Sequence, residues 1–207
     1  RYKVTFKGPG GHSWGAFGLA NPHHAMGRAI RIFDENAPSV TTVGEKTSYN
    51  VGRMGGGTSI NSIPFESWME VDMRSGSQDK LDDIDAVLKA AVEQALQEEN
   101  ADRLDGPALT VEVARVGTRP AAQQESSEPL VQRSMAATLA FDIQPSLRIS
   151  STDSNLPISK GIPAVTMSRG GISGNSHSPD EWWQNDDGHI GIQIGLLTLL
   201  TEAGLAE

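Results

Sequence analysis

Hydrophobic and polar positions alternate in the first half of the chain with the periods of strands and helices. In residues 2–6, apolar and polar side chains alternate, which predicts a strand with one buried face. The same period of two predicts strands over about 65–74 and 109–114, and a further strand is expected over about 47–53. Apolar residues at helical spacing predict helices over about 22–34 and 78–100. The resulting order, β-α-β-β-α-β, predicts an antiparallel sheet with two helices on one face.

The second half of the chain has a different pattern. It predicts helices over 130–141 and 187–203 and short buried strands over 147–150 and 162–168. The last helix is apolar over more than half its circumference, so we expect it to be well buried. Buried strands that alternate with helices are typical of an α/β domain with a parallel sheet. A helix is also expected to begin at Pro179.

We therefore predict the α/β class, with two parts. Residues 1–117 form a β-α-β-β-α-β (ferredoxin-like) domain with an antiparallel sheet, and residues 118–207 form a partial α/β domain. The chain starts at Arg1 and enters a strand pattern at once. Because N-termini usually have some slack, we expect that an upstream part of a longer protein is missing.

Composition excludes several classes of protein. The 207 residues include no cysteine, so disulfide scaffolds and thiolate metal sites are impossible. A formal net charge of -9 repels phosphate and argues against nucleic-acid binding. No run approaches the length of apolar residues that a membrane-spanning helix needs, so no membrane partner is expected. We expect a cytoplasmic location.

Two histidines lie in loops that favour chemistry. His12 follows two glycines, which permit a sharp turn and leave the imidazole uncrowded. Such a side chain can donate to a developing oxyanion or act as acid or base, or it can be an ordinary exposed loop residue. His177 is a possible metal ligand, with Asp180 and Glu181 as possible companions, or a simple loop residue. One histidine alone cannot hold zinc, which needs three or four protein ligands.

Three further positions have the residue types of a binding site. Arg74 ends the third strand, where a guanidinium suits a carboxylate ligand, although a surface pair with Asp72 or Glu70 is the simpler alternative. Asn61 follows a glycine-rich loop and is either a substrate-binding amide or a turn residue. Asp153 follows a short predicted strand, a place where α/β folds put ligand contacts.

Taken in order, these motifs resemble the M20 family of dinuclear zinc metallopeptidases and deacylases, most closely its peptidase T-like, tripeptidase-related branch. The resemblance spans the whole chain. It rests on the motifs Gly10-Gly11-His12-Ser13, Gly55-Gly56-Gly57 with Asn61-Ser62-Ile63-Pro64, Asp72-Met73-Arg74, Ser151-Thr152-Asp153 and Gly174-x-x-His177-x-x-x-Glu181. Each motif is weak alone, and their order and spacing make the resemblance specific.

The resemblance implies a role for each candidate residue. Residues 1–117 would be the dimerisation (lid) domain of a homodimer, and residues 118–207 the C-terminal portion of the catalytic domain. His12 would stabilise the oxyanion in the partner protomer's site, Asn61 and Arg74 would bind substrate, and Thr152 and Asp153 would line the pocket. His177 would be one ligand of a pair of zinc ions whose other ligands belong to the missing N-terminal portion.

The implied reaction is hydrolysis of amide bonds in short peptides, by an aminopeptidase- or dipeptidase-like enzyme. Because these motifs are shared, an N-acyl amino acid deacylase is an open alternative. A second alternative is that the chain alone is a non-catalytic dimerisation module, because it lacks most of the metal ligands. A small-molecule sensor built on the β-α-β-β-α-β domain is a third.

Overall fold

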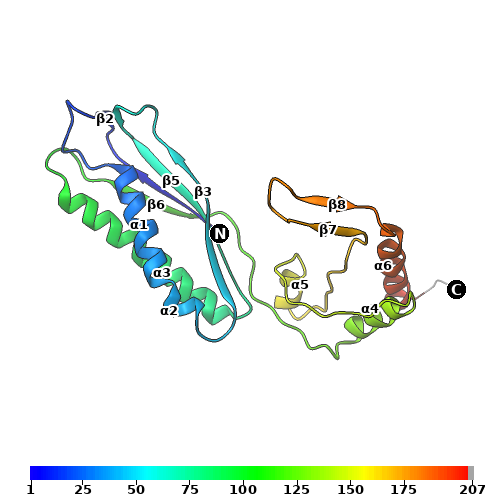
Figure 1. Cartoon of the computed structure of the whole chain (residues 1–207). Helices are drawn as coiled ribbons and strands as arrows, with labels where there is room; N and C mark the ends of the chain where they lie inside the picture. The colour runs from blue at the N-terminus through cyan, green and yellow to red at the C-terminus, as the bar shows by residue number, and fades with distance from the viewer. Residues whose placement is uncertain (205–207) are drawn as a thin grey trace. The chain divides into compact units, whose positions relative to one another are not determined.

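The chain forms two compact units, Arg1–Ala121 (unit 1) and Ala122–Glu207 (unit 2). A computed structural model describes residues 1–204. The mixed α/β class expected from the sequence is confirmed, and unit 1 has the predicted element order (Figure 1).

Unit 1 is built on a four-stranded sheet with the strand order β3-β5-β1-β6. These strands are β1 (Tyr2–Lys7), β3 (Thr47–Gly56), β5 (Glu66–Ser75) and β6 (Thr110–Arg115). Every neighbouring pair is antiparallel. Helices α1 (Pro22–Asn36) and α3 (Gln78–Asp102) cover one face, and the short α2 (Pro38–Thr41) follows α1 (Figure 1). This is the split β-α-β arrangement predicted from the periodicity.

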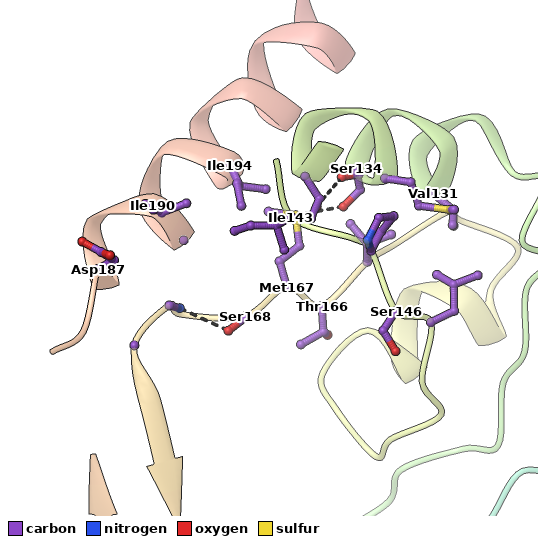
Figure 2. A pocket seen from close by; sticks show the side chains of 18 of the residues that line it. Val131, Ser134, Ile143, Ser146, Thr166, Met167, Ser168, Asp187, Ile190 and Ile194 are labelled. Atoms are coloured by element: carbon purple, nitrogen blue, oxygen red, sulfur yellow. Dashed lines mark hydrogen bonds between the residues drawn. The ribbon is translucent and has the colours of Figure 1, made fainter. Parts of the chain in front are cut away.

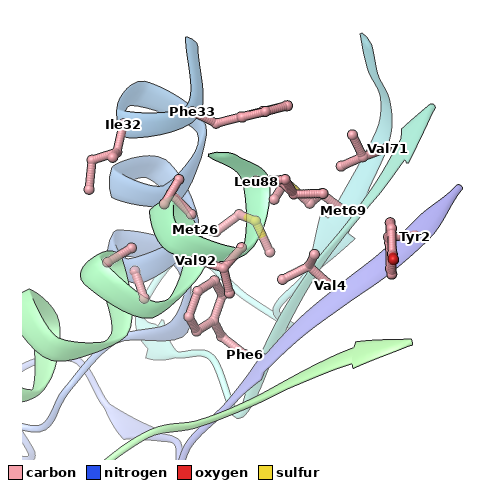
Figure 3. Packing of buried hydrophobic residues seen from close by; sticks show 14 of the residues in the cluster. Tyr2, Val4, Phe6, Met26, Ile32, Phe33, Met69, Val71, Leu88 and Val92 are labelled. Atoms are coloured by element: carbon pink, nitrogen blue, oxygen red, sulfur yellow. The ribbon is translucent and has the colours of Figure 1, made fainter. Parts of the chain in front are cut away.

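The core of unit 1 lies between this face and the two helices. Met69 and Val71 on β5 are buried and alternate with partly exposed residues, as period-two strands require. Phe33 from α1 and Leu88 from α3 pack against the same face, as Figure 3 shows. Burial of such side chains is the main favourable contribution to folding, at about 25 cal/mol for each Å² of apolar surface.

The first helix begins where the sequence predicted. The Asn21 side chain caps it by accepting a hydrogen bond of 2.9 Å from the His23 backbone N–H. The Asn21 backbone N–H donates over 2.8 Å to the buried carboxylate of Glu99 on α3. The Arg28 guanidinium lies 3.3 Å from the other Glu99 oxygen. Glu99 therefore ties the start of α1 to α3.

Unit 2 contains helices α4 (Pro129–Leu139), α5 (Asn155–Ser159) and α6 (Gly188–Ala203). Strands β7 (Ile172–Gly174) and β8 (Trp182–Gln184) form an antiparallel pair. The helices at 130–141 and 187–203 are confirmed within two residues at each end. The strands expected at 147–150 and 162–168 are wrong: within residues 122–204, β7 and β8 make up the only ladder, and it is not parallel. The helix expected from Pro179 is also wrong, because Pro179 and Asp180 lie in a turn and β8 begins at Trp182.

The last helix is less buried than its composition predicted. Ile192, Leu196 and Leu199 on α6 are 72%, 55% and 61% exposed. The described part of unit 2 therefore leaves part of the apolar surface of α6 uncovered.

Nothing within residues 1–204 forms a helix with the length and apolar character needed to cross a bilayer. The expected cytoplasmic location stays a prediction.

Candidate functional site

A small ladder brings two of the predicted site residues together. Strand β2 (Gly11–His12) pairs antiparallel with β4 (Ser62–Ile63), and His12 lies opposite Ser62. The pairing continues one step further, since the Ser13 N–H donates to the Asn61 carbonyl oxygen over 2.9 Å. His12 and Asn61 therefore lie on successive rungs of one ladder, where side chains alternate between its two faces.

Glycine is required at the turn that leads into this ladder. Gly10 has φ +66°, and a Cβ there would lie 3.2 Å from the Cβ of Phe65. A residue with a side chain would meet both backbone strain and crowding. This explains in physical terms why a glycine precedes Gly11 and His12.

The loop backbone holds the His12 ring in one orientation. The backbone N–H groups of Trp14 and Gly15 both lie 3.2 Å from Nδ1 and donate to it. A ring nitrogen that accepts hydrogen bonds carries a lone pair, so the proton of the neutral imidazole resides on Nε2. Because the side chain is exposed, this Nε2–H is a donor that faces away from its own loop.

Asn61 has a similarly fixed orientation. The Ser59 hydroxyl donates to Oδ1 over 2.8 Å, which assigns the oxygen to the inner side of the loop. The Nδ2 amide meets no acceptor among residues 1–204, so it can donate to a ligand. The β2–β4 ladder of unit 1 thus carries two donors, the His12 Nε2–H and the Asn61 amide.

Arg74 lies at the other end of β5. Between Ser67, near the β2–β4 ladder, and Arg74, the strand advances by about 23 Å, at about 3.3 Å per residue. The Arg74 Nε donates to Asp72 over 2.6 Å, and the Arg1 Nε donates to the other oxygen of the same carboxylate over 2.6 Å. Burial opposes ionisation of Asp72, but these hydrogen bonds outweigh it and lower the Asp72 pKa. The surface pair with Asp72, the simpler alternative for Arg74, is therefore present.

In unit 2, Thr152 and Asp153 lie in the segment that enters α5. The Thr152 N–H donates to Asn155 Oδ1 over 2.9 Å, and its hydroxyl oxygen accepts from Thr166 over 2.8 Å. Asp153 beside it is exposed. The contacts of Thr152 orient the backbone that carries the Asp153 carboxylate.

His177 lies in the loop between β7 and β8. Its backbone has φ +65°, the left-handed region that is unusual for a residue with a side chain. The Glu181 carboxylate accepts from the His177 backbone N–H over 3.2 Å, so Glu181 is near the backbone of this loop. Across residues 1–204, no three histidine, aspartate or glutamate side chains gather closely enough to hold a metal ion. The residues described here therefore do not make a dinuclear zinc site.

A pocket in unit 2 was not predicted from the sequence. It has a volume of about 410 Å³ and lies between α4, α6 and residues 165–171. In Figure 2, Ile190 and Ile194 on α6 face the segment that carries Met167. The Ser134 hydroxyl donates to the Met167 sulfur over 3.2 Å. The pocket depends on residues far apart in the sequence, and neither His177 nor Thr152 contributes to its lining.

Sequence reasoning also missed the surroundings of His12. Trp14 and Ile60, on the two segments that meet at the ladder, are 88% and 104% exposed. The sequence feature that could have indicated these exposed apolar side chains is the absence of Asp, Glu, Lys and Arg from residues 8–22 and 54–65.

Comparison with known families identifies unit 1. The model of the peptidase dimerisation domain of the M20 type matches residues 1–100. Residues 1–100 therefore belong to the peptidase dimerisation domain family, which confirms the resemblance carried by the motifs. A search of curated proteins finds no match.

Solved structures similar to the chain include both peptidases and amidases. Aminopeptidase PepT from Bacillus cereus is 20% identical, with a TM-score of 0.65, over 98% of this chain and 51% of its own. A hydantoinase/carbamoylase-family amidase from Burkholderia vietnamiensis is 17% identical, with a TM-score of 0.71, over 98% of this chain and 47% of its own. The protein AtUAH, solved with (S)-hydroxyglycine, is 18% identical, with a TM-score of 0.74, over 97% and 46%. These similarities show a shared fold, and the chain spans about half the length of these proteins.

Proposed function

We propose that the chain is part of an M20-type hydrolase that cleaves amide bonds in short peptides and acts as a homodimer through residues 1–117. In this proposal residues 118–207 are the C-terminal portion of the catalytic domain. The dimerisation domain over residues 1–100 supports self-association.

The observation that carries the proposal is the fixed orientation of His12. Hydrolysis of an amide places negative charge on the carbonyl oxygen in the transition state. A donor already aimed at that charge, which need not reorganise, typically contributes a few kcal/mol. His12 has this property, because two backbone N–H groups hold Nδ1 and leave the Nε2–H exposed. Asn61, one step along the same ladder, adds an amide donor for the substrate.

The separation of Arg74 from His12 supports a site shared between protomers. About 23 Å of strand separates their ends of the sheet, which is longer than a dipeptide or tripeptide. This separation favours an arrangement in which the two groups that meet one short substrate come from different copies of unit 1. In a homodimer, His12 and Asn61 of one protomer can act with Arg74 of the other, which would bind the substrate carboxylate.

The zinc ions implied by the family form part of this proposal for the longer protein. His177 is the proposed ligand, with Thr152 and Asp153 lining the substrate pocket. Because residues 1–204 contain no set of three ligands, the remaining ligands would come from another part of that protein.

Hydrolysis by a longer protein that contains this chain tests the proposal. We expect turnover of one or more of three substrate sets: dipeptides, tripeptides and N-acyl amino acids, with zinc or cobalt supplied. Preference for dipeptides or tripeptides would indicate a peptidase, and preference for N-acyl amino acids would indicate a deacylase. Absence of hydrolysis of all three would refute the proposal.

A second candidate function applies to the 207-residue chain by itself. The lack of a three-ligand cluster in the described residues favours a dimerisation module without catalysis. We expect elemental analysis of the purified chain to find no stoichiometric pair of zinc ions. Two tightly bound ions per chain would contradict this.

A further inference from the structure

Two arginines share one aspartate at the end of the sheet of unit 1. The Arg1 Nε donates to one Asp72 oxygen and the Arg74 Nε donates to the other, both over 2.6 Å. The backbone explains this arrangement, because Tyr2 pairs with Val71 across β1 and β5 and both are buried beneath the helices. Since side chains alternate along a strand, Arg1, Asp72 and Arg74 lie on the opposite face, which α1 and α3 leave uncovered (Figure 1).

The Arg1 side chain is held at its stem as well as at its guanidinium group. The stem lies against Gly117, where a Cβ would be 3.3 Å from the Arg1 Cδ. The Val116 N–H donates to the Arg1 carbonyl oxygen over 3.0 Å, and the Arg1 nitrogen donates to the Gly117 carbonyl oxygen over 3.1 Å. In a longer protein that nitrogen is a peptide N–H, which can donate the same hydrogen bond. The guanidinium is therefore preorganised, and little ordering cost is left for a ligand to offset.

The three charged groups together carry an excess of positive charge. Burial opposes ionisation of Asp72, yet the hydrogen bonds from Arg1 and Arg74 lower its pKa, so the carboxylate is charged at neutral pH. Glu70, the preceding residue on the same face of β5, is paired with Arg53 over 2.9 Å. Arg74 and Asp72 by themselves would form a neutral pair. Arg1 supplies the further positive charge that attracts an anion.

Both guanidinium groups have further N–H groups to offer a ligand. The contact with Asp72 uses the N–H on Nε, and the other N–H groups of each arginine lie on its two Nη atoms. The Arg1 and Arg74 side chains are 50% and 48% exposed, compared with 29% for Asp72. The planar fork of donors on a guanidinium matches the two oxygens of a carboxylate.

We propose that Arg1 is a specificity-determining residue that binds the carboxylate of the substrate together with Arg74. Asp72 is the positioning residue that holds both guanidinium groups at this place. The inference rests on the proposed hydrolysis of short peptides or N-acyl amino acids, and it adds a residue to the proposed role of Arg74. Because these substrates end in a free carboxylate and their amides do not, the site selects acids over the corresponding amides.

Nitrogen-15 NMR of the arginine Nε–H groups tests the binding without hydrolysis. The 207-residue chain is acetylated at its N-terminus, because the α-amino charge of Arg1 is absent from a longer protein. Titration with N-acetylalanine should shift the Nε–H resonances of Arg1 and Arg74 along one binding curve, with a Kd of about 1 mM. N-acetylalaninamide should shift neither. Arg53, paired with Glu70 on the same face, is the internal control and should not respond.

Substitution of Arg1 in the proposed longer hydrolase tests the effect on substrates. Arg1→Gln keeps a donor for Asp72 and removes the charge, so it should raise KM for a substrate with a free carboxylate by about tenfold or more, with kcat within about twofold. The KM for the corresponding amide should stay within about twofold. Arg1→Lys keeps the charge without the planar fork and should give an intermediate KM. Arg53→Gln, the matched control on the same face, should leave KM within about twofold.

Two results would overturn the inference. The first is an Arg1 resonance that does not respond to N-acetylalanine, or responds equally to its amide. The second is a longer protein that hydrolyses its substrates while Arg1→Gln changes KM equally for acids and amides, which would leave the proposed function intact. Absence of hydrolysis by the unchanged longer protein would instead refute the proposed function, and the NMR titration would still decide whether Arg1 and Arg74 bind a carboxylate.

Discussion

At the scale of single residues, the surroundings of His12 determine what its ring can do. The sequence placed His12 after two glycines and left open whether it is a donor, an acid or base, or an ordinary loop residue. The role that the structure favours for His12, a donor through Nε2–H, depends on two backbone N–H groups that donate to Nδ1. Their direction follows from the path of the loop and cannot be obtained from residue types.

For Arg74 and His177 too, residue type alone does not give the contacts that the folded chain makes. Residue type and position suggested a carboxylate ligand for Arg74, and the structure shows a carboxylate already present, that of Asp72. For His177, the sequence offered Asp180 and Glu181 as companions, but Glu181 accepts from the His177 backbone. Spacing in sequence could not reveal this, because a loop with φ +65° at His177 redirects the side chains.

The tautomer of His12 is a direct prediction at this scale. We expect the neutral imidazole to carry its proton on Nε2, because Nδ1 accepts from Trp14 and Gly15. Nitrogen-15 NMR of the 207-residue chain, at a pH where histidine is neutral, distinguishes the two tautomers. A protonated Nδ1 would show that the two backbone contacts do not form in solution.

At the scale of elements, the periodic parts of unit 1 could be predicted and the strands of unit 2 could not. Strand β5 alternates buried and partly exposed residues because one face packs on helices and the other does not. Residues 147–150 and 162–168 have the apolar composition of strands, but Leu147, Ile149 and Ile162 are 57%, 87% and 56% exposed. A strand exists only through hydrogen bonds to a neighbour, and no local pattern encodes that neighbour.

Helix α6 shows the same dependence on context. Its apolar circumference predicted burial, yet only Gly188 and Thr198 are buried among its residues. Composition reports which surfaces are suited to burial and does not identify what covers them.

The cap of α1 gives a prediction for an element. Asn21→Ala removes the side-chain acceptor for the His23 N–H and should lower the free energy of unfolding of unit 1 by about 1 kcal/mol. Asn21→Ser retains an oxygen acceptor and should lower it by less than about 0.5 kcal/mol. Urea unfolding followed by circular dichroism measures both. Equal losses in the two variants would indicate that the side-chain cap does not stabilise the helix.

At the scale of the whole molecule, the order of motifs carried more information than any single motif. Gly10-Gly11-His12-Ser13, Asn61-Ser62-Ile63-Pro64 and Asp72-Met73-Arg74 were each ambiguous alone. The match of residues 1–100 to the peptidase dimerisation domain confirms the family that their order indicated. The resemblance already implied that His12 acts in the partner protomer's site, and the distance of about 23 Å along β5 between the two ends of the sheet adds support for that proposal.

Complementation between two inactive variants tests the proposed sharing of a site between protomers most directly. In the proposed longer hydrolase, His12→Ala should lower kcat by about a hundredfold or more, and His177→Ala should inactivate the site to which it belongs. A hybrid dimer of the two variants has one site in which His177 of one protomer acts with His12 of the other. In an equal mixture after subunit exchange, half the dimers are hybrids, so activity should return to about one quarter of the unchanged enzyme. A mixture that stays as inactive as its components would contradict a site shared between protomers.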